Sequence, residues 1–354
     1  MKIVSVVGAR PQFVKLAAIS RELDKSELGI VHTIVHTGQH YDKVLSDNFF
    51  NEFEIPTPIL NLRVGSGTHA EQTASILVPL EKFLYEELPD LVITYGDTNS
   101  AFGAAIVAAK MKIPLAHLEA GLRSKNKSMP EELNRITIDH LSNINLAPTF
   151  NSLINLKNEG LSETSLLVGD VMVDVFNRTQ FTPIAKLPIA ENFRNGEDFF
   201  LATLHREELT SSKEKLVSLF EALTKLRNPV VLPIHPRLEK QLSKFGLNDL
   251  SGNNLKIIPP LSHQEILGVM SRSTGVLTDS GGLQKEAYLL KKPCVTLRSE
   301  TEWVETLVGG WNVLIWENFE ALENFPQSPL ESLHNPLAFG DGYAARRIVE
   351  ALTS

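Results

Sequence analysis

The sequence predicts an α/β protein with two Rossmann-like, doubly wound domains that face each other across a cleft. Apolar runs of strand length alternate with segments of helical spacing, and this alternation restarts after residues 168–171. A strand, helix, strand rhythm predicts parallel sheets with right-handed crossovers. The 354 residues exceed one typical core and suit two domains, predicted at residues 1–169 and 170–339.

The first domain is expected to start with a buried strand at residues 3–7, an almost wholly apolar run. Pro11 is suited to the first turn of the helix that follows. Further strands are predicted at residues 29–35, 91–95, 113–118 and 144–147. Helices are predicted at residues 13–23, 68–88, 101–111 and 131–141.

The second domain repeats this pattern. Its strands are predicted at residues 199–204, 230–234, 255–258 and 275–278. Its helices are predicted at residues 213–226, 238–245 and 264–270. Residues 293–297, 301–308 and 312–316 continue the alternation.

Polar side chains stand where the predicted strands of the first domain end: Arg10, His36, Asp97 and Glu119. Ligands of parallel sheets bind beyond the carboxyl ends of the strands, so one crevice can collect these residues. Asp97 and Glu119 end consecutive strands, and neighbouring carboxylates can exchange protons with a substrate. Asp97 has a second interpretation as a helix N-cap, whereas Glu119 has no evident structural task.

Glu131 has an alternative interpretation that is purely structural. Ser128-Met129-Pro130-Glu131 has the spacing of a capping box. In such a box Glu131 would reach back to the backbone amide of Ser128. The residues alone favour this capping role over a catalytic one.

The turn Ser280-Gly281-Gly282 follows the predicted strand at residues 275–278 and opens a segment of helical spacing. Unpaired N–H groups and the helix dipole make such a turn a seat for phosphate. A Cβ would hold a phosphate oxygen away from the backbone, which explains the glycines. Glu286 is placed to bind a ribose diol. The alternative is an ordinary turn capped by Ser280.

Two more strand ends of the second domain carry cationic or potentially cationic residues. His205 and Arg206 follow one strand, and His235 and Arg237 follow the next. These residues share the predicted sheet edge with Ser280, and a histidine there could act on a leaving phosphate. The alternative for each histidine is a hydrogen-bonded loop residue.

The composition excludes several classes of protein. A net charge of −8 argues against a nucleic-acid surface, and the apolar runs are too short to cross a membrane. The N-terminus is expected to be a strand and not a secretory signal, and the single cysteine, Cys294, suits a reducing cytoplasm. No G-x-G-x-x-G follows the first strand, which argues against a dinucleotide dehydrogenase. Metal binding by His36 and His40 has little support because no helix aligns them.

Along nearly its whole length the sequence resembles the non-hydrolysing UDP-N-acetylglucosamine 2-epimerase family. The segments of the resemblance are Gly8-Ala9-Arg10-Pro11, Thr37-Gly38-Gln39-His40, Gly96-Asp97-Thr98, His117-Leu118-Glu119-Ala120-Gly121-Leu122-Arg123, Pro130-Glu131-Glu132-Leu133-Asn134-Arg135, Ala147-Pro148-Thr149, His205-Arg206, Asp279-Ser280-Gly281-Gly282-Leu283-Gln284, Asn335-Pro336 and Gly340-Asp341-Gly342.

The resemblance implies a glycosyltransferase-B type of fold with UDP between the domains, and a last helix at residues 340–354 that packs back on the first domain. It also implies a homodimer, and a reaction that needs neither metal nor NAD. The proton leaves C2 while UDP leaves C1, and UDP then adds back to a 2-acetamidoglucal with a proton on the opposite face.

The resemblance implies roles for the residues named above. The catalytic candidates are Asp97, Glu119, Glu131 and His205. The candidates for substrate binding are Arg10, Lys15, His36, Gln39, Arg135, Arg206, His235, Arg237, Ser280, Gly281, Gly282 and Glu286. The resemblance thus favours a catalytic role for Glu131, which the residues alone did not. Which carboxylate serves which face of the sugar stays open.

Some positions differ from the common family pattern. Gln12 and Lys285 replace acidic residues, and Thr301-Glu302-Trp303-Val304-Glu305 replaces Thr-Glu-Arg-Pro-Glu. These differences are similar to the branch that acts on UDP-2,3-diacetamido-2,3-dideoxy-glucuronate, so two substrates stay open. The segment at residues 64–69 lacks the Arg-Gln of an activating second UDP-sugar site, and allosteric activation is not expected.

Overall fold

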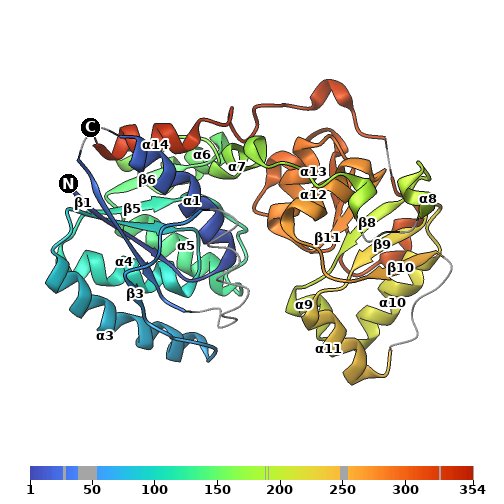
Figure 1. The fold of residues 1–354 in the computed structure, drawn as a ribbon, viewed down its shortest axis with the longest axis horizontal. Helices are drawn as coiled ribbons and strands as arrows, with labels where there is room; N and C mark the ends of the chain where they lie inside the picture. Colours follow the sequence, from blue (N-terminus) through green and yellow to red (C-terminus); the bar gives the residue numbers. More distant parts are fainter. Residues whose placement is uncertain are drawn as a thin grey trace. The chain divides into compact units, whose positions relative to one another are not determined.

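A computed structural model describes residues 1–26, 29–38, 54–187, 189, 191–247, 254–326 and 328–353. The chain divides into two compact units (Figure 1). Unit 1 comprises Met1–Arg178 and Leu337–Ser354, and unit 2 comprises Thr179–Pro336.

Unit 1 is built on a seven-stranded sheet with the order β3-β2-β1-β4-β5-β6-β7, in which neighbouring strands pair in parallel. The strands are β1 (Lys2–Val7), β2 (Val31–His36), β3 (Leu60–Asn61), β4 (Leu91–Tyr95), β5 (Leu115–Leu118), β6 (Ile144–Ala147) and β7 (Ser165–Leu167). The sequence did not predict β3 and β7. These edge strands have only two and three residues and are partly or fully exposed, so they carry no buried apolar run.

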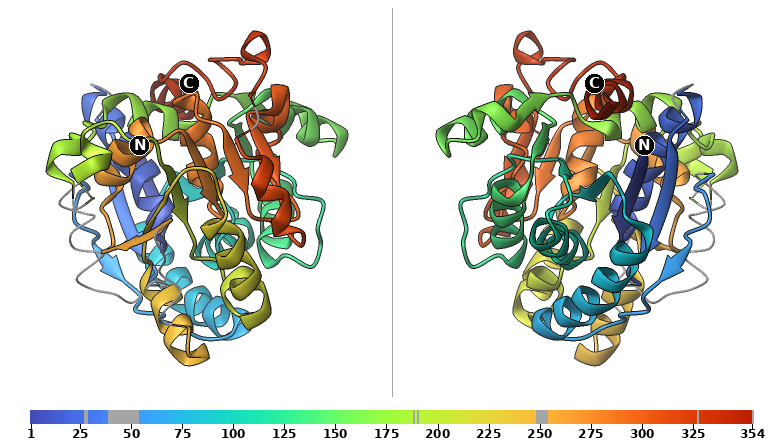
Figure 2. Two further views of the ribbon diagram at one scale, coloured as in Figure 1. Left: turned by 90° about the vertical axis from the view of Figure 1, so that its right-hand side faces the viewer. Right: turned by 90° about the vertical axis from the view of Figure 1, so that its left-hand side faces the viewer.

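Helices cover both faces of this sheet (Figure 2). They are α1 (Arg10–Lys25), α3 (His69–Glu87), α4 (Asn99–Met111), α5 (Pro130–Leu141), α6 (Phe150–Asn158), α7 (Val171–Arg178) and α14 (Ala344–Thr353), with the 3₁₀ turn η1 (Ser162–Thr164). One apolar core joins the sheet to α1, α7 and α14, and a second joins its other face to α3 and α4. Because α7 packs in the first core, unit 1 ends after this helix and not before it.

Unit 2 repeats the design with a six-stranded parallel sheet of order β10-β9-β8-β11-β12-β13. Its strands are β8 (Phe200–Thr203), β9 (Val230–Pro233), β10 (Leu255–Ile258), β11 (Gly275–Thr278), β12 (Cys294–Thr296) and β13 (Asn312–Leu314). Its helices are α8 (Glu191–Arg194), α9 (Glu207–Thr210), α10 (Lys213–Thr224), α11 (Pro236–Phe245), α12 (His263–Arg272) and α13 (Gly281–Leu289). The 3₁₀ turns are η2 (Ile184–Lys186), η3 (Val304–Gly310), η4 (Phe319–Asn324) and η5 (Glu331–Leu333).

In both sheets the strand order reverses beside the first strand of the unit. The reversal lies between β1 and β4 in unit 1, and between β8 and β11 in unit 2. Ligands of such sheets bind outside the carboxyl ends of the strands at this switch point. The predicted α/β class with two doubly wound sheets is confirmed, and the topology directs attention to the strand ends.

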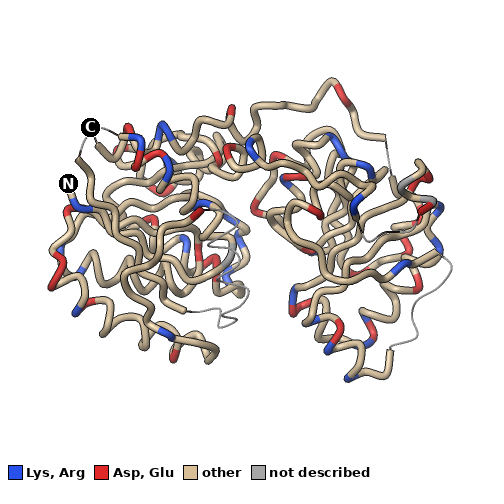
Figure 3. The backbone as a smooth tube through the Cα atoms, viewed as in Figure 1, with Lys and Arg blue, Asp and Glu red and all other residues tan. Residues whose placement is uncertain are grey.

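The described residues were also compared with the features of membrane proteins and metalloproteins. None of their helices is both long and apolar enough for a membrane span. No group of three His, Cys, Asp or Glu side chains among them could hold a metal ion. Acidic and basic residues are interspersed along both units (Figure 3). Cys294 is buried in β12, and burial raises the pKa of its thiol to about 12.

Candidate active site

The carboxylates of Asp97 and Glu119 follow β4 and β5, which pair so that Tyr95 lies opposite Leu118. Gly96 directly precedes Asp97 and lies close to the side chain of Glu119. A Cβ on Gly96 would lie 3.1 Å from Glu119 Oε2, and Gly96 has a φ of +62°. A glycine suits this position because the backbone is left-handed and Glu119 approaches it closely. The structure therefore brings the two predicted carboxylates to one edge.

Glu119 has an unusual backbone and a cationic partner. Its φ is +73°, which side-chain-bearing residues rarely adopt. Its Oε2 pairs with Nζ of Lys15, a buried residue of α1. Burial alone would lower the pKa of Lys15, but the carboxylates of Glu119, Asp170 and Asp97 outweigh burial and hold it above its ordinary value. Lys15 thus places a lasting positive charge beside Glu119.

Asp97 does not cap a helix. The N-cap of α4 is Thr98, whose hydroxyl accepts the N–H of Ala101 at 3.2 Å. Oδ2 of Asp97 instead pairs with Nη2 of Arg135 on α5, and its backbone carbonyl accepts Nδ2 of Asn134 at 2.8 Å. The capping interpretation is therefore wrong, and the side chain of Asp97 is held through Arg135.

The predicted capping box at Glu131 is also wrong. Helix α5 starts at Pro130 with Met129 as its N-cap, and the Ser128 amide donates to Asn126 Oδ1 at 3.0 Å. Ser128 lies one position too early to cap the helix. Glu131 is exposed at the start of α5.

The next residue, Glu132, is buried and was not singled out from the sequence. Its carboxylate accepts the N–H groups of Ser124 at 2.9 Å and Lys125 at 2.8 Å, and lies 3.1 Å from Nη1 of Arg135. Glu132 thus orders the loop before α5 and holds the arginine that pairs with Asp97.

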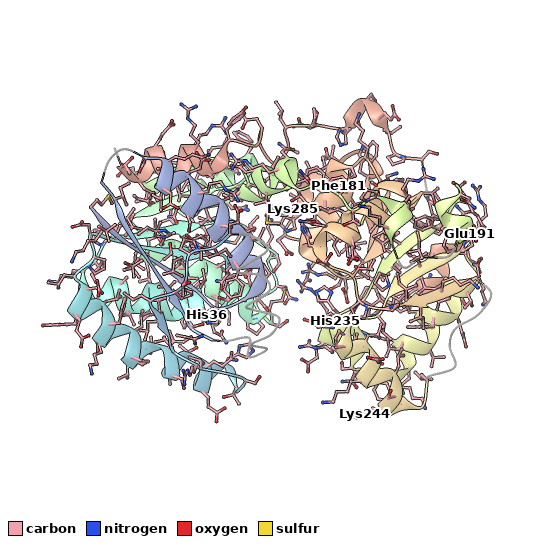
Figure 4. All side chains as sticks on the ribbon, viewed as in Figure 1. His36, Phe181, Glu191, His235, Lys244 and Lys285 are labelled. Atoms are coloured by element: carbon pink, nitrogen blue, oxygen red, sulfur yellow. The ribbon has the colours of Figure 1, made fainter. Side chains whose placement is uncertain are left out.

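The other candidates of unit 1 have mixed outcomes. Helix α1 starts at Arg10, but the position of that side chain is outside the described structure, as is the whole of Gln39. His36 ends β2, is buried, and stacks on Phe13 with 5.1 Å between ring centroids (Figure 4).

Gln12 has a structural explanation. Its Oε1 accepts the N–H groups of Gly8 at 2.7 Å and Ala9 at 2.9 Å, and its Nε2 donates to the Tyr95 carbonyl at 2.6 Å. A glutamate could not make the last contact because an ionised carboxylate has no donor. The amide at Gln12 therefore ties β1 to β4, and its presence says nothing about the charge of the substrate.

In unit 2 the predicted phosphate turn has the expected form. β11 ends at Thr278, and α13 starts at Gly281 with Ser280 as its N-cap, whose hydroxyl accepts the N–H of Leu283 at 3.4 Å. The capping role and an anion seat are compatible, because the first N–H groups of a helix have no partner within it.

The two glycines of this turn have different surroundings. A Cβ on Gly281 would lie 2.8 Å from Glu302 Oε1, so the Glu302 carboxylate, which pairs with Arg298, would have to shift. A Cβ on Gly282 would approach only Ser280 Oγ, at 3.9 Å. The packing of the protein therefore does not require a glycine at position 282.

Asp279 connects the turn to His205, and the sequence candidates did not include it. Its Oδ2 accepts the N–H groups of His205 and Arg206, both at 2.8 Å, and its Oδ1 lies 2.7 Å from His205 Nδ1. Burial raises the pKa of Asp279, but these partners outweigh burial and lower it below its ordinary value. A carboxylate at Nδ1 directs Nε2 of His205 away from Asp279, as needed for contact with a ligand.

His235 and Arg237 have structural explanations. His235 is the N-cap of α11, and its Nδ1 accepts the N–H of Arg237 at 3.2 Å. Its ring lies 5.9 Å from that of His205, centroid to centroid. Arg237 is exposed, 3.9 Å from Glu207, and such surface pairs contribute little. His235 therefore stays beside His205 while also capping a helix.

Glu286 and Lys285 lie on α13 and are both buried. Oε1 of Glu286 is 2.6 Å from Nε2 of His263 on α12, so its orientation depends on a histidine that the sequence candidates omitted. Lys285 is labelled in Figure 4. Its Nζ lies 3.5 Å from the centre of the Trp303 ring. Lys285 and Trp303 both differ from the common family pattern, and they contact each other.

The two units present different groups of polar residues. Unit 1 presents two adjacent carboxylates, each paired with a cation, which suits proton transfer at a substrate carbon. Unit 2 presents a glycine turn at a helix N-terminus beside an oriented histidine, which suits a diphosphate. Neither set resembles a nucleophile–base pair or a metal centre among the described residues.

Comparisons with known proteins agree with this chemistry. The family model described as UDP-N-acetylglucosamine 2-epimerase matches residues 21–353. A Methanococcus maripaludis protein called a UDP-N-acetylglucosamine 2-epimerase homolog is 45% identical, over 99% of either chain. The UDP-2,3-diacetamido-2,3-dideoxy-D-glucuronate 2-epimerase of Pseudomonas aeruginosa is 41% identical, also over 99% of either chain.

A solved structure is similar over the whole chain. The UDP-GlcNAc 2-epimerase of Methanocaldococcus jannaschii, in complex with UDP-GlcNAc and UDP, has a TM-score of 0.87 and 40% sequence identity. The likeness covers 100% of this chain and 99% of that one. It confirms the glycosyltransferase-B type of fold expected from the sequence.

Proposed function

The chain belongs to the UDP-N-acetylglucosamine 2-epimerase family, and on this basis we propose that it inverts C2 of UDP-N-acetylglucosamine to give UDP-N-acetylmannosamine. The reaction is of the non-hydrolysing type, so the sugar is returned to UDP. Elimination removes the C2 proton and breaks the bond between C1 and the UDP oxygen. UDP then adds back to the 2-acetamidoglucal, and a proton is delivered to the opposite face of C2.

In this proposal the carboxylates of unit 1 handle the proton. A C2 hydrogen beside an acetal carbon is weakly acidic, so its removal needs a positioned base and a leaving group whose charge is neutralised. Asp97, Glu119 and Glu131 are the proposed acid and base groups. Arg135 pairs with Asp97, and Lys15 pairs with Glu119.

The leaving UDP is assigned to unit 2 and to Arg10. The turn at Ser280, Gly281 and Gly282 would hold the diphosphate through backbone N–H groups, and His205 would contact its oxygens. Glu286 would bind the ribose. The remaining proposed substrate contacts are His36, Gln39, Arg206, His235 and Arg237.

The observation that carries the proposal is the contact at the ends of β4 and β5. Glu119 Oε2 lies against Gly96, the residue before Asp97, and each of the two carboxylates has a cationic partner on a helix. Pairing of both carboxylates with buried cations suits groups that must hold one orientation while they exchange protons.

Deuterium incorporation tests the proposal. Incubation with UDP-N-acetylglucosamine in deuterated water should place deuterium at C2 of both UDP-sugars. NMR and mass spectrometry of the products measure this incorporation. Glu119→Gln should slow incorporation by at least about 100-fold, because a proton-transfer group is lost. The exposed Glu163→Gln serves as the matched control and should match the wild type. Products without C2 deuterium would instead indicate a glycosyltransferase, and free N-acetylmannosamine a hydrolysing enzyme.

A second substrate is favoured by the surroundings of Gly281. Lys285 is a buried cation of unit 2 that contacts Trp303, and Trp303 Nε1 would lie 3.6 Å from a Cβ on this glycine. Arg298 is also buried, but Glu302, 3.1 Å away, neutralises its charge. Buried positive charge suits an acidic sugar such as UDP-2,3-diacetamido-2,3-dideoxy-glucuronate, on which the relative from Pseudomonas aeruginosa acts. Comparing kcat/KM on the two UDP-sugars decides between them. A preference for the neutral sugar would remove this candidate.

We further propose that the enzyme works as a cytoplasmic homodimer in polysaccharide biosynthesis. The family resemblance supports the dimer, and the single buried thiol suits a reducing compartment. Light scattering after size-exclusion chromatography tests the dimer, and a mass near that of one 39.3 kDa chain would contradict it.

A further inference from the structure

Unit 1 also holds a histidine–carboxylate pair, His117 and Asp139. His117 belongs to β5, two residues before Glu119, and its ring is fully buried. Nδ1 lies 2.6 Å from Oδ1 of Asp139 on α5, and Nε2 lies 2.8 Å from the carbonyl oxygen of Gly96. Both neighbours are acceptors, and each ring nitrogen of His117 lies within hydrogen-bond distance of one of them.

Asp139 continues the contacts toward a second turn. Its Oδ2 accepts the N–H of Gly121 at 3.1 Å and lies 2.7 Å from Nη1 of Arg123. Arg123 in turn binds Glu159 through two hydrogen bonds of 2.8 and 2.7 Å. Burial raises the pKa of Asp139, but His117 and Arg123 outweigh burial and lower it below its ordinary value. Asp139 is therefore a buried carboxylate with a partner on each oxygen.

The two ends of this chain of contacts flank the proposed catalytic carboxylates. Gly96 directly precedes Asp97, and Gly121 lies two residues after Glu119. The backbone is left-handed at Gly96, Glu119 and Gly121, with φ values of +62°, +73° and +81°. A left-handed glutamate costs free energy, and such strain persists only where surrounding contacts impose it.

We propose that His117 and Asp139 are positioning residues that hold the Asp97 and Glu119 turns in a single geometry. The proposal rests on the function proposed above. His117 binds the turn before Asp97, and Asp139 binds the turn after Glu119, so the pair sets the separation of the two carboxylates. Loss of either partner leaves a buried group unpaired and therefore lowers stability as well. Turnover is compared at a temperature at which every variant is folded.

Two substitutions of His117 separate the two contacts. The amide nitrogen of glutamine reproduces the position of Nε2, so His117→Gln keeps a donor for the Gly96 carbonyl. The amide nitrogen of asparagine reproduces Nδ1, so His117→Asn keeps a donor for Asp139 and loses the contact to Gly96. The matched control is His32→Gln. His32 lies in the same sheet and makes one hydrogen bond through Nε2, to Ser5 Oγ at 2.8 Å.

Turnover is measured as C2 deuterium incorporation, with UDP binding followed by calorimetry. His117→Asn should lower kcat by about 100-fold, the effect of misplacing a reacting group by roughly 1 Å. His117→Gln should lose about tenfold less activity, and KM and the Kd for UDP should change less than about threefold in both variants. Equal kcat losses in the two variants, or a similar loss in His32→Gln, would overturn the proposal.

A measurement that needs no turnover distinguishes failure of the positioning proposal from failure of the proposed epimerase function. The 2.6 Å contact between His117 and Asp139 should give a far-downfield proton NMR signal in the free protein. The signal should persist in His32→Gln and vanish in both His117→Gln and Asp139→Asn. Its absence from the wild type would overturn the positioning proposal. Failure of the wild type to incorporate deuterium, with the signal present, would overturn the proposed function alone.

Discussion

At the scale of single residues, a substitution at Gly282 tests ligand binding without disturbing the packing of the protein. A Cβ there would approach only Ser280 Oγ, so Gly282→Ala should leave the melting temperature unchanged or slightly raised. The added methyl group should hold a phosphate oxygen away from the backbone. UDP affinity should then fall about tenfold, equal to ~1.4 kcal/mol, as measured by calorimetry.

Gly281→Ala provides the comparison for this prediction. Here the Cβ would lie 2.8 Å from Glu302 Oε1, so both stability and UDP binding should decline. If Gly282→Ala bound UDP as tightly as the wild type, the diphosphate would not lie on this turn.

Asp279 links stability to pH. Its pKa is lowered in the folded protein, so its contribution is present above its ordinary pKa of about 4 and is lost as the pH falls through the folded value. Asp279→Asn should reduce the free energy of unfolding by about 2–4 kcal/mol at neutral pH, because the backbone N–H groups of His205 and Arg206 lose a charged acceptor.

Urea unfolding at several pH values measures this effect. The difference between wild type and Asp279→Asn should shrink as the pH is lowered from 5 toward the folded pKa of the aspartate. A difference that stayed constant over this range would show that the ionised carboxylate is not responsible.

The residue scale also shows what the sequence could reveal about the site. Asp97 and Glu119 were identifiable because each follows an apolar strand, and strand ends of a parallel sheet share one edge. Glu132 was not separated from Glu131, because spacing does not tell which of two adjacent acids is buried. Asp279 was not identified, because its partners, the N–H groups of His205 and Arg206, belong to another strand end. His117 and His263 depend on partners on other elements, which no local pattern encodes.

At the scale of elements, α14 depends on a carboxylate from α7. Oδ1 and Oδ2 of Asp174 accept the N–H groups of Ala344 at 3.0 Å and Ala345 at 2.8 Å. Asp174→Ala removes this cap and should reduce the free energy of unfolding by about 1–2 kcal/mol. Amide hydrogen exchange should quicken first in α14.

Asp341→Asn, three residues before α14, is the matched control. Asp341 pairs with Arg347, but both side chains are about two-fifths exposed, with fractions of 39% and 42%. Such a pair contributes at most about 1 kcal/mol, so exchange in α14 should change little. Equal effects of the two substitutions would show that the buried cap stabilises α14 no more than the exposed ion pair does.

A long buried stretch makes the bounds of an element easier to predict from the sequence. β1 and β4, with five buried residues each, were found within a residue of their bounds. α7 was taken for a domain crossing because it has only eight residues next to a glycine, and its apolar face is satisfied by α1 and α14. α5 was found, but Pro130 and not Ser128 sets its start.

At the scale of the whole molecule, the two units differ in how the chain builds them. Unit 2 is one continuous segment, Thr179–Pro336, whereas unit 1 needs Leu337–Ser354 as well. A fragment of residues 179–336 should therefore fold alone and show a cooperative thermal transition. A fragment of residues 1–178 should be unstable, because removing α14 exposes the core around Ile19 and Leu23.

Circular dichroism of both fragments checks this prediction. Adding a peptide of residues 337–354 to the fragment 1–178 should restore helicity and raise its melting temperature. A fragment 1–178 as stable as the full chain would show that α14 is dispensable for unit 1.

The buried thiol of Cys294 has a practical consequence. Thiol reagents attack the thiolate, and a pKa of about 12 together with complete burial keeps this side chain unreactive at neutral pH. New cysteines placed on the surface can therefore be spin-labelled or coupled to fluorophores without first deleting the native one. A label on α3 and another on α10 would measure the distance between the units in solution, with and without nucleotide.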